Sequence, residues 1–161
     1  MKNFNVSMLA LATLPGALVA QEDANSEPYL KSRPNVVMIY ADDLGFGDLE
    51  CYGAVGVRTP NINRLSNNGL RFTNAHAVAS TSTPSRYSLL TGEYPWRKSG
   101  TDVATGDAAM IISPDKYTVA DVFKDAGYTT AAFGKWHLGL GSQIGKQDWN
   151  ALITPALGDI G

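Results

Sequence analysis

The sequence predicts an α/β fold in which a buried parallel sheet is covered by helices, and three observations support this prediction. Residues 35–41 (NVVMIYA) form a nearly continuous apolar run, which is typical of a strand buried on both faces of a parallel sheet. Start and stop signals predict helices over 60–68, 84–91 and 119–126. Acidic residues follow the apolar run directly, at the sheet edge where open α/β folds bind their ligands.

Length and composition limit the function classes. The 161 residues are enough for one domain with a core of its own, and a content of 44% hydrophobic and 17% charged residues is ordinary. A net charge of −2 shows no basic excess of the kind that favours nucleic-acid binding. Cys51 is the single cysteine, which excludes an intramolecular disulfide within this sequence, and its neighbours favour a buried small residue over a nucleophile.

The first residues have the pattern of an export signal. Residues 1–20 resemble a secretory signal peptide, with Lys2 as the positive start and an apolar core from Met8 to Val19. This apolar core is too short to span a bilayer comfortably, so no stable membrane insertion is expected. The polar residues 21–33 are predicted to be a flexible lead-in. We therefore expect an exported mature protein.

Asp42 and Asp43, which follow the apolar run, are candidate metal ligands. Adjacent residues of a regular strand point to opposite faces, so both carboxylates can converge on one ion only if the strand ends near Ala41. Hard oxygen ligands suit Ca²⁺ or Mg²⁺ better than zinc. A solvated Asp-Asp turn is the alternative, and Asp48 is expected to be a turn or cap residue.

The segment from Ser82 to Gly92 (STPSRYSLLTG) combines a hydroxyl, a helix start and an arginine, and a predicted strand over 71–79 leads to it. Pro84 favours the first turn of a helix and Gly92 ends it, which leaves Ser82 at the helix N-terminus, where an anion is favoured. Arg86 lies four residues later and returns to the face that carries Ser82. This arrangement indicates a site for an oxyanion ester. An ordinary capped helix with a surface arginine is the alternative.

The string GKWHLGLG, residues 134–141, follows a predicted strand over 128–133, and a short extended segment is also expected at 110–112. Lys135 and His137 are two residues apart, so an extended backbone would place both side chains on one face. A lysine can hold an oxyanion, and a histidine can transfer protons near neutral pH. A strand-end lysine and a structural histidine are the alternative.

Three strings in these segments resemble the motifs of the type I sulfatases and occur in the order found in that family: YADDLGFGD at 40–48, STPSR with LTG at 82–92, and GKWHLG at 134–139. The resemblance extends from Pro34 to about Asn150. It implies an alkaline-phosphatase-like α/β fold with a mixed, mostly parallel sheet between helices. Residues 34–161 would then form the N-terminal part of the catalytic domain.

The resemblance also implies a cofactor and a modification. Asp42 and Asp43 would be metal ligands for Ca²⁺, with Mg²⁺ as the alternative. Ser82 would be oxidised after translation to formylglycine, whose hydrate is both a nucleophile and a metal ligand. One hydroxyl of the hydrate would attack sulfur, and the substrate alcohol would leave. Deprotonation of the second hydroxyl would then expel sulfate and restore the aldehyde.

The same family pattern implies roles for three further residues. Arg86 would neutralise charge beside the modified residue, and Lys135 would bridge the hydrate and the sulfate. His137 would contact a hydroxyl of the hydrate. The expected reaction is hydrolysis of a sulfuric ester, arylsulfatase-like and directed at a sulfated carbohydrate.

A serine at position 82, where most of the family has cysteine, implies maturation by a radical enzyme compatible with anaerobic life. We therefore expect a bacterial protein of the periplasm or the extracellular space that requires a sulfatase-maturating enzyme as its partner. The family's remaining metal ligands and leaving-group residues lie beyond this region, so an N-terminal fragment without appreciable turnover is expected. A phosphomonoester or phosphonate hydrolase of the same superfamily and a non-catalytic secreted relic are the alternatives.

Overall fold

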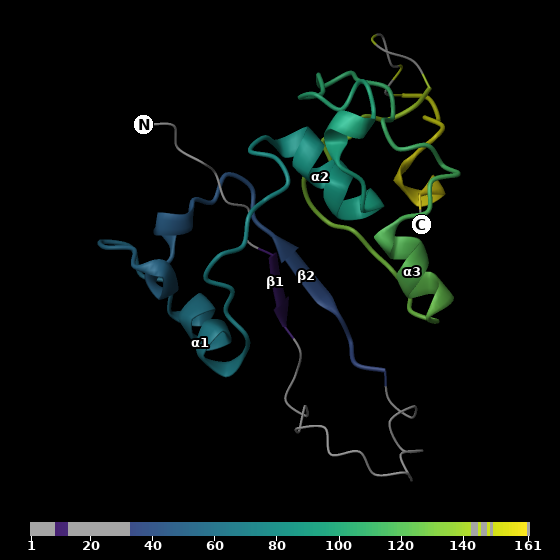
Figure 1. Ribbon diagram of the computed structural model, residues 1–161. Helices are drawn as coiled ribbons and strands as arrows, with labels where there is room; N and C mark the ends of the chain where they lie inside the picture. The colour runs from purple at the N-terminus through teal and green to yellow at the C-terminus, as the bar shows by residue number, and fades with distance from the viewer. Residues whose placement is uncertain (1–8, 13–32, 143–144, 146–147, 149, 161) are drawn as a thin grey trace. The chain divides into compact units, whose positions relative to one another are not determined.

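The computed structural model describes residues 9–12, 33–142, 145, 148 and 150–160, and the chain divides into two units, 1–76 and 77–161 (Figure 1). Apart from residues 9–12 and 33, the predicted signal peptide and lead-in lie outside the described residues. No helix in the described part of the chain has both the length and the apolar character that a membrane span requires.

The first unit contains a two-stranded antiparallel sheet of β1, Leu9–Ala12, and β2, Val37–Tyr40 (Figure 1). In its register Leu9 faces Tyr40 and Ala12 faces Val37. The strand predicted in residues 35–41 is therefore confirmed in position, but its predicted burial on both faces is wrong. Val37 and Ile39 are 61% and 64% exposed, because among the described residues β2 pairs with β1 alone and no parallel ladder forms.

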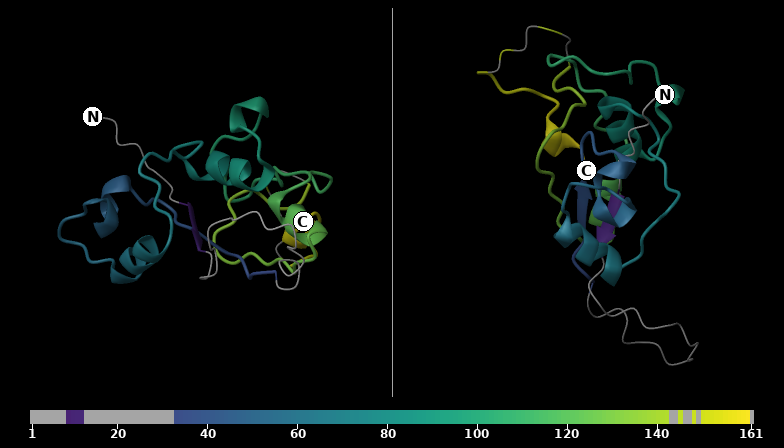
Figure 2. Two further views of the ribbon diagram at one scale, coloured as in Figure 1. Left: turned by 60° about the horizontal axis from the view of Figure 1, so that its bottom comes forward. Right: turned by 90° about the vertical axis from the view of Figure 1, so that its left-hand side faces the viewer.

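Three short helices complete the first unit: η1 at Phe46–Asp48, η2 at Glu50–Tyr52 and α1 at Pro60–Asn68 (Figure 2). Helix α1 begins after Thr59 and ends before Gly69, as predicted. Glu50 joins η2 to α1, because its carboxylate accepts hydrogen bonds from the Thr59 N–H and, at 2.8 Å, from Asn63. The carboxylate of Asp48 accepts a 2.6 Å bond from the Gly45 N–H, which confirms the predicted cap role.

The strand predicted over 71–79 is wrong, since the backbone there is irregular. A strand needs a neighbour to pair its N–H and C=O groups, and no described segment supplies one here. The segment is instead held by side chains: the Tyr52 hydroxyl donates to Phe72 O at 2.8 Å. His76 is exposed and lies 2.9 Å from the Asn74 side-chain oxygen.

The second unit contains α2 at Ser82–Thr91, η3 at Pro95–Arg97, α3 at Val119–Asp125 and η4 at Leu157–Asp159 (Figure 1). Both predicted helices are confirmed. Gly92 ends α2 with a φ of 70°, a left-handed conformation that glycine adopts without steric cost, and its N–H donates to Ser88 O.

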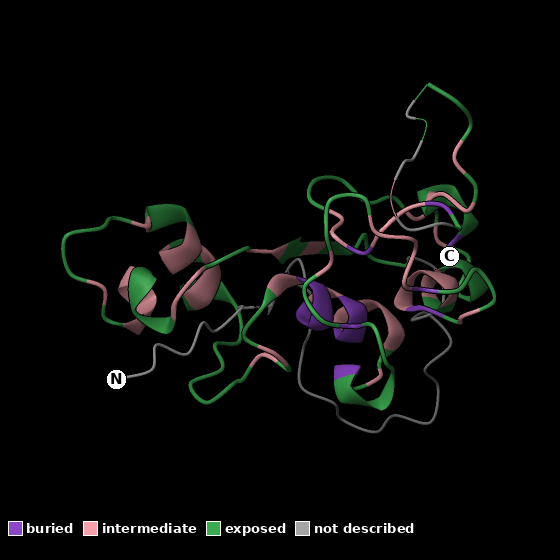
Figure 3. Ribbon diagram, turned by 90° about the horizontal axis from the view of Figure 1, so that it is seen from above, coloured by how far each residue is buried: buried purple, intermediate pink, exposed green. Residues whose placement is uncertain are grey.

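The core of the second unit lies against α2, and Figure 3 shows most of the first half of this helix buried. Tyr87 of α2 packs with Ile112, Leu138 and Ile160, each of which is at most 7% exposed. Leu138 directly follows His137, so the core anchors the segment that carries two of the predicted site residues.

Residues 138–141 are held by backbone bonds to 108–111. Ile111 N donates to Leu138 O at 2.9 Å, and Leu140 N donates to Ala108 O at 3.0 Å. These bonds follow no regular ladder, so neither segment is a strand. The strand predicted over 128–133 is also wrong: its backbone is irregular and Phe133 is 96% exposed, because no described segment pairs with it.

Candidate active site

The first turn of α2 brings Ser82 and Arg86 together. Thr81 has extended backbone angles and precedes the helix, and Pro84 is buried in the first turn, where its missing N–H costs nothing. Arg86 Nε donates to Ser82 Oγ at 2.8 Å. The prediction that Arg86 lies on the same helix face as Ser82 is therefore confirmed. The positively charged guanidinium contacts the Ser82 hydroxyl at the N-terminus of a ten-residue helix, which is the positive end of the helix dipole.

Arg86 also joins α2 to the segment of Lys135. Its Nη1 donates to the backbone oxygen of Lys135 at 2.7 Å. One planar guanidinium therefore holds Ser82 and the Lys135 backbone at the same time, which orients the charge more firmly than a single bond would. Lys135 itself is exposed.

Thr83, the residue after Ser82, forms a second connection that the sequence did not predict. Thr83 is 0% exposed, and its hydroxyl donates to His137 O at 3.0 Å. The same hydroxyl oxygen accepts a 3.0 Å bond from the Ala104 N–H. Thr83 and Arg86 therefore fix residues 135–137 against the first turn of α2.

His137 has an unusual backbone conformation for a residue other than glycine, with a φ of 57°. The alternation expected from an extended backbone fails at this residue, so Lys135 and His137 are not two neighbours on one face of a strand. The ring Nε2 of His137 lies 2.9 Å from Ala104 O. Its Nδ1 is buried and has no hydrogen-bond partner among the described residues.

Asp42 and Asp43 belong to the first unit, whereas Ser82 belongs to the second. Strand β2 ends at Tyr40 and Asp43 has a φ of 55°, so the condition for two adjacent carboxylates to converge is met. Both residues are exposed. Their hard oxygens fit Ca²⁺ or Mg²⁺ and supply part of the roughly six to eight ligands that Ca²⁺ takes. Within the described residues no group of three His, Cys, Asp or Glu side chains is arranged to hold a metal.

Comparison with known proteins gives the family. Residues 34–153 match the family model described as sulfatase, which is more than half of the chain. The chain belongs to the sulfatase family. It is 50% identical over 161 residues to the N-acetylgalactosamine-6-O-sulfatase of Bacteroides thetaiotaomicron, covering 98% of this chain and 31% of that relative. It is 45% identical over 113 residues to human arylsulfatase A, covering 68% of this chain and 22% of that protein.

A solved structure supports the same fold. The chain is similar, at a TM-score of 0.71 and 55% identity, to a structure from work on the metabolism of multiple glycosaminoglycans by Bacteroides thetaiotaomicron. The match covers 74% of this chain and 25% of that one. The predicted alkaline-phosphatase-like α/β fold is thereby confirmed for the part that this sulfatase chain spans. That part is about a third or less of the length of these relatives.

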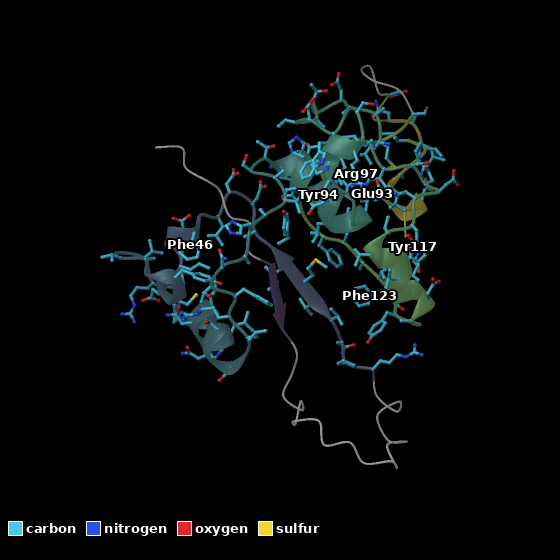
Figure 4. The ribbon with its side chains drawn as sticks, in the orientation of Figure 1. Phe46, Glu93, Tyr94, Arg97, Tyr117 and Phe123 are labelled. Carbon is cyan, nitrogen blue, oxygen red and sulfur yellow. The ribbon has the colours of Figure 1, made fainter. Side chains whose placement is uncertain are left out.

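The carboxyl end of α2 in this sulfatase chain is stabilised by a buried tyrosine and an ion pair, both of which meet at Glu93. Glu93 is labelled in Figure 4. The carboxylate of Glu93 pairs with Lys116 and accepts a 2.7 Å bond from the Tyr87 hydroxyl. The hydrogen bond from Lys116 and then that from Tyr87 hold the pKa of Glu93 below its usual value, while burial raises the pKa of Tyr87. These residues line a cavity of about 180 Å³ together with Lys98 and Ser113. This network fixes the end of α2 whose beginning carries Ser82.

Proposed function

We propose that the protein containing this chain hydrolyses sulfate esters, using Ser82 after its conversion to formylglycine. The observation that carries the proposal is the 2.8 Å bond between Arg86 Nε and Ser82 Oγ at the start of α2, in a chain that belongs to the sulfatase family. An arginine already bonded to the reacting side chain is in place to neutralise the sulfuryl oxygens. Alkaline-phosphatase-like relatives that act on phosphate are less well supported, since the family model and the curated relatives are sulfatases.

The residues around Ser82 fit the modification. One hydroxyl of hydrated formylglycine would attack sulfur and displace the substrate alcohol. Loss of the proton from the second hydroxyl would then expel sulfate and restore the aldehyde. The buried Nδ1 of His137 lacks a partner among the described residues and can accept the proton of a hydroxyl donor. The exposed ammonium of Lys135 can hold the sulfate, because Arg86 ties its backbone to the helix that carries Ser82.

Asp42 and Asp43 are proposed to hold Ca²⁺, with Mg²⁺ as the alternative ion. A divalent ion supplies Lewis-acid stabilisation of charge on the sulfuryl group. Both carboxylates follow the end of β2, and the left-handed φ of Asp43 takes them out of the strand alternation. The bond from Gly45 N to Asp48 fixes the start of the turn that follows these aspartates.

A 6-O-sulfated N-acetylgalactosamine unit of a glycosaminoglycan is the proposed substrate class. The relative named N-acetylgalactosamine-6-O-sulfatase is 50% identical over 161 residues, and the similar solved structure comes from work on glycosaminoglycan metabolism. We further propose that the protein is exported to the periplasm or the extracellular space through residues 1–20 and is matured by a radical-type enzyme. The serine at position 82 and the apolar core from Met8 to Val19 support these two steps.

The test is sulfate release by the full-length protein co-expressed with an anaerobic maturase. We expect inorganic sulfate from a 6-O-sulfated N-acetylgalactosamine saccharide and from an aryl sulfate, and much slower release of phosphate from the matching aryl phosphate. The Ser82→Ala variant is expected to release neither. Faster turnover of the aryl phosphate would favour the phosphohydrolase alternative, and no turnover of any ester would favour a non-catalytic relic. Because the chain spans about a third of its relative, purified residues 21–161 are expected to show no appreciable turnover.

A further inference from the structure

We infer that Thr83 is a positioning residue that fixes the orientation and the tautomer of His137. The threonine is fully buried, and its hydroxyl bonds to the backbone of His137 and to the backbone of Ala104. Ala104 in turn accepts a hydrogen bond from the His137 ring. The inference concerns the hydroxyl that follows the modified residue, and its mechanistic meaning rests on the proposed function.

The three hydrogen bonds form a closed network. Thr83 Oγ1 donates to His137 O at 3.0 Å and accepts from Ala104 N at 3.0 Å. The third hydrogen bond, between His137 Nε2 and Ala104 O at 2.9 Å, closes the network. The Thr83 hydroxyl therefore donates its hydrogen to the segment of His137 and accepts a hydrogen bond from the segment of Ala104. Moving either segment breaks a bond of a residue that is 0% exposed.

The hydrogen-bond network determines which side-chain nitrogen of a neutral His137 carries the proton. A backbone carbonyl oxygen can only accept, so Nε2 must carry the hydrogen when it bonds to Ala104 O. Nδ1 then has a free lone pair, and it is this buried atom that lacks a partner among the described residues. Without the bond to Ala104, a neutral imidazole exchanges between two tautomers, and only one of them presents Nδ1 as an acceptor.

The conformation of His137 explains why a separate positioning residue is needed. A φ of 57° is unfavourable for a residue with a Cβ, by roughly 1–2 kcal/mol. Such a conformation persists where surrounding contacts over-determine it. Two of those contacts are the bond from Thr83 to His137 O and the burial of Leu138, which is 0% exposed. Thr83 therefore acts through His137 and not on the substrate.

The test is nitrogen NMR of the histidine rings, which reports the tautomer without any need for activity. In the full-length protein labelled with ¹⁵N-histidine, the signals that are missing from a His137→Gln variant identify His137. At a pH where the rings are neutral, we expect wild-type His137 to be protonated at Nε2 and unprotonated at Nδ1. Thr83→Ser keeps the hydroxyl and is expected to keep this pattern, whereas Thr83→Val is expected to move both nitrogens toward a mixture of tautomers.

Thr118→Val is the matched control, because Thr118 is also buried, at 2%, and its hydroxyl bonds to Asp121 at 2.7 Å, away from His137. We expect that variant to lose stability without a change in the His137 spectrum. Thr83→Cys, with a weakly bonding group of similar size, is expected to give an intermediate spectrum and serves if the valine variant does not fold. A wild-type His137 protonated at Nδ1, or a Thr83→Cys spectrum identical to that of the wild type, would overturn the inference.

An activity readout separates this inference from the proposed function. Per converted Ser82, Thr83→Val is expected to lower kcat for an aryl sulfate by about ten- to a hundredfold with little change in KM, since proton transfer is impaired and binding is not. Thr83→Ser is expected to restore the rate. If the protein hydrolyses no sulfate ester while the spectra behave as expected, the positioning role stands and the proposed function fails. A valine variant with unchanged kcat would refute the role in catalysis.

Discussion

Replacing Arg86 with lysine keeps the positive charge and removes the geometry that the structure shows. The guanidinium donates simultaneously to Ser82 Oγ at 2.8 Å and to Lys135 O at 2.7 Å. An ammonium has one nitrogen and cannot reproduce this planar pair of bonds. Each lost bond costs about 1 kcal/mol net, and water can replace the more exposed one, so we expect a loss of about 1–2 kcal/mol in the free energy of unfolding.

The effect of Arg86→Lys on turnover is expected to exceed its effect on stability. Removal of one donor aimed at the developing charge typically costs about 10²–10³ in kcat. The assay is aryl sulfate hydrolysis by the full-length protein, expressed per mole of converted Ser82, because the substitution lies within the segment that is modified. Arg64→Lys, an exposed change in α1, is the matched control. Turnover of Arg86→Lys equal to that of the wild type would refute the reasoning.

Three further outcomes are expected. Gly139→Ala should lower the free energy of unfolding by about 3 kcal/mol or more. The φ of Gly139 is 72°, and a Cβ there would lie 1.9 Å from the backbone oxygen of Ala109. A melting temperature equal to that of the wild type would contradict this. The hydrogen bond from Lys116 holds the pKa of Glu93 below its ordinary 4.5, so this carboxylate stabilises the fold fully above pH 4.5 and loses its contribution as the pH falls through the lowered value. Urea unfolding at a series of pH values should therefore show a flatter acid limb for Glu93→Gln, and an unchanged limb would exclude this role. Asp42→Asn should weaken Ca²⁺ binding to the full-length protein in titration calorimetry, and unaltered affinity would remove this residue from the ligand set.

Helices α1, α2 and α3 were predictable because their signals are local. Thr59 and Pro60 mark the start of α1, and Gly92 marks the end of α2 with the left-handed conformation that glycine favours. The contact between Ser82 and Arg86 was predictable for the same reason, since a spacing of four residues determines which helix face carries each side chain.

The strands were predicted less well because pairing is not local. Residues 71–79 and 128–133 have strand-like composition, yet both are irregular, and the apolar side chain of Phe133 is 96% exposed. Apolar patterning shows that a segment prefers an extended, buried environment, but a neighbouring strand must supply the pairing. Strand β2 finds its partner in residues 9–12, a segment that the sequence assigned to a signal peptide.

The role of Thr83 could not be predicted from the sequence. Its two partners, Ala104 and His137, lie 21 and 54 residues away, and no pattern links the three positions. The left-handed conformation of His137 was equally hidden, since residues with a Cβ seldom adopt it and the motif predicts an extended strand end. A threonine at a helix start was the one signal that the sequence offered, and such a residue has many ordinary explanations.

Mass spectrometry of the peptide that contains Ser82, from protein isolated from its native producer, tests the central claim most directly. A sulfatase of this type should show Ser82 lighter by two hydrogens, with an aldehyde that reacts with hydrazides. An unmodified serine, in cells shown to contain a working maturase, would contradict the proposed function.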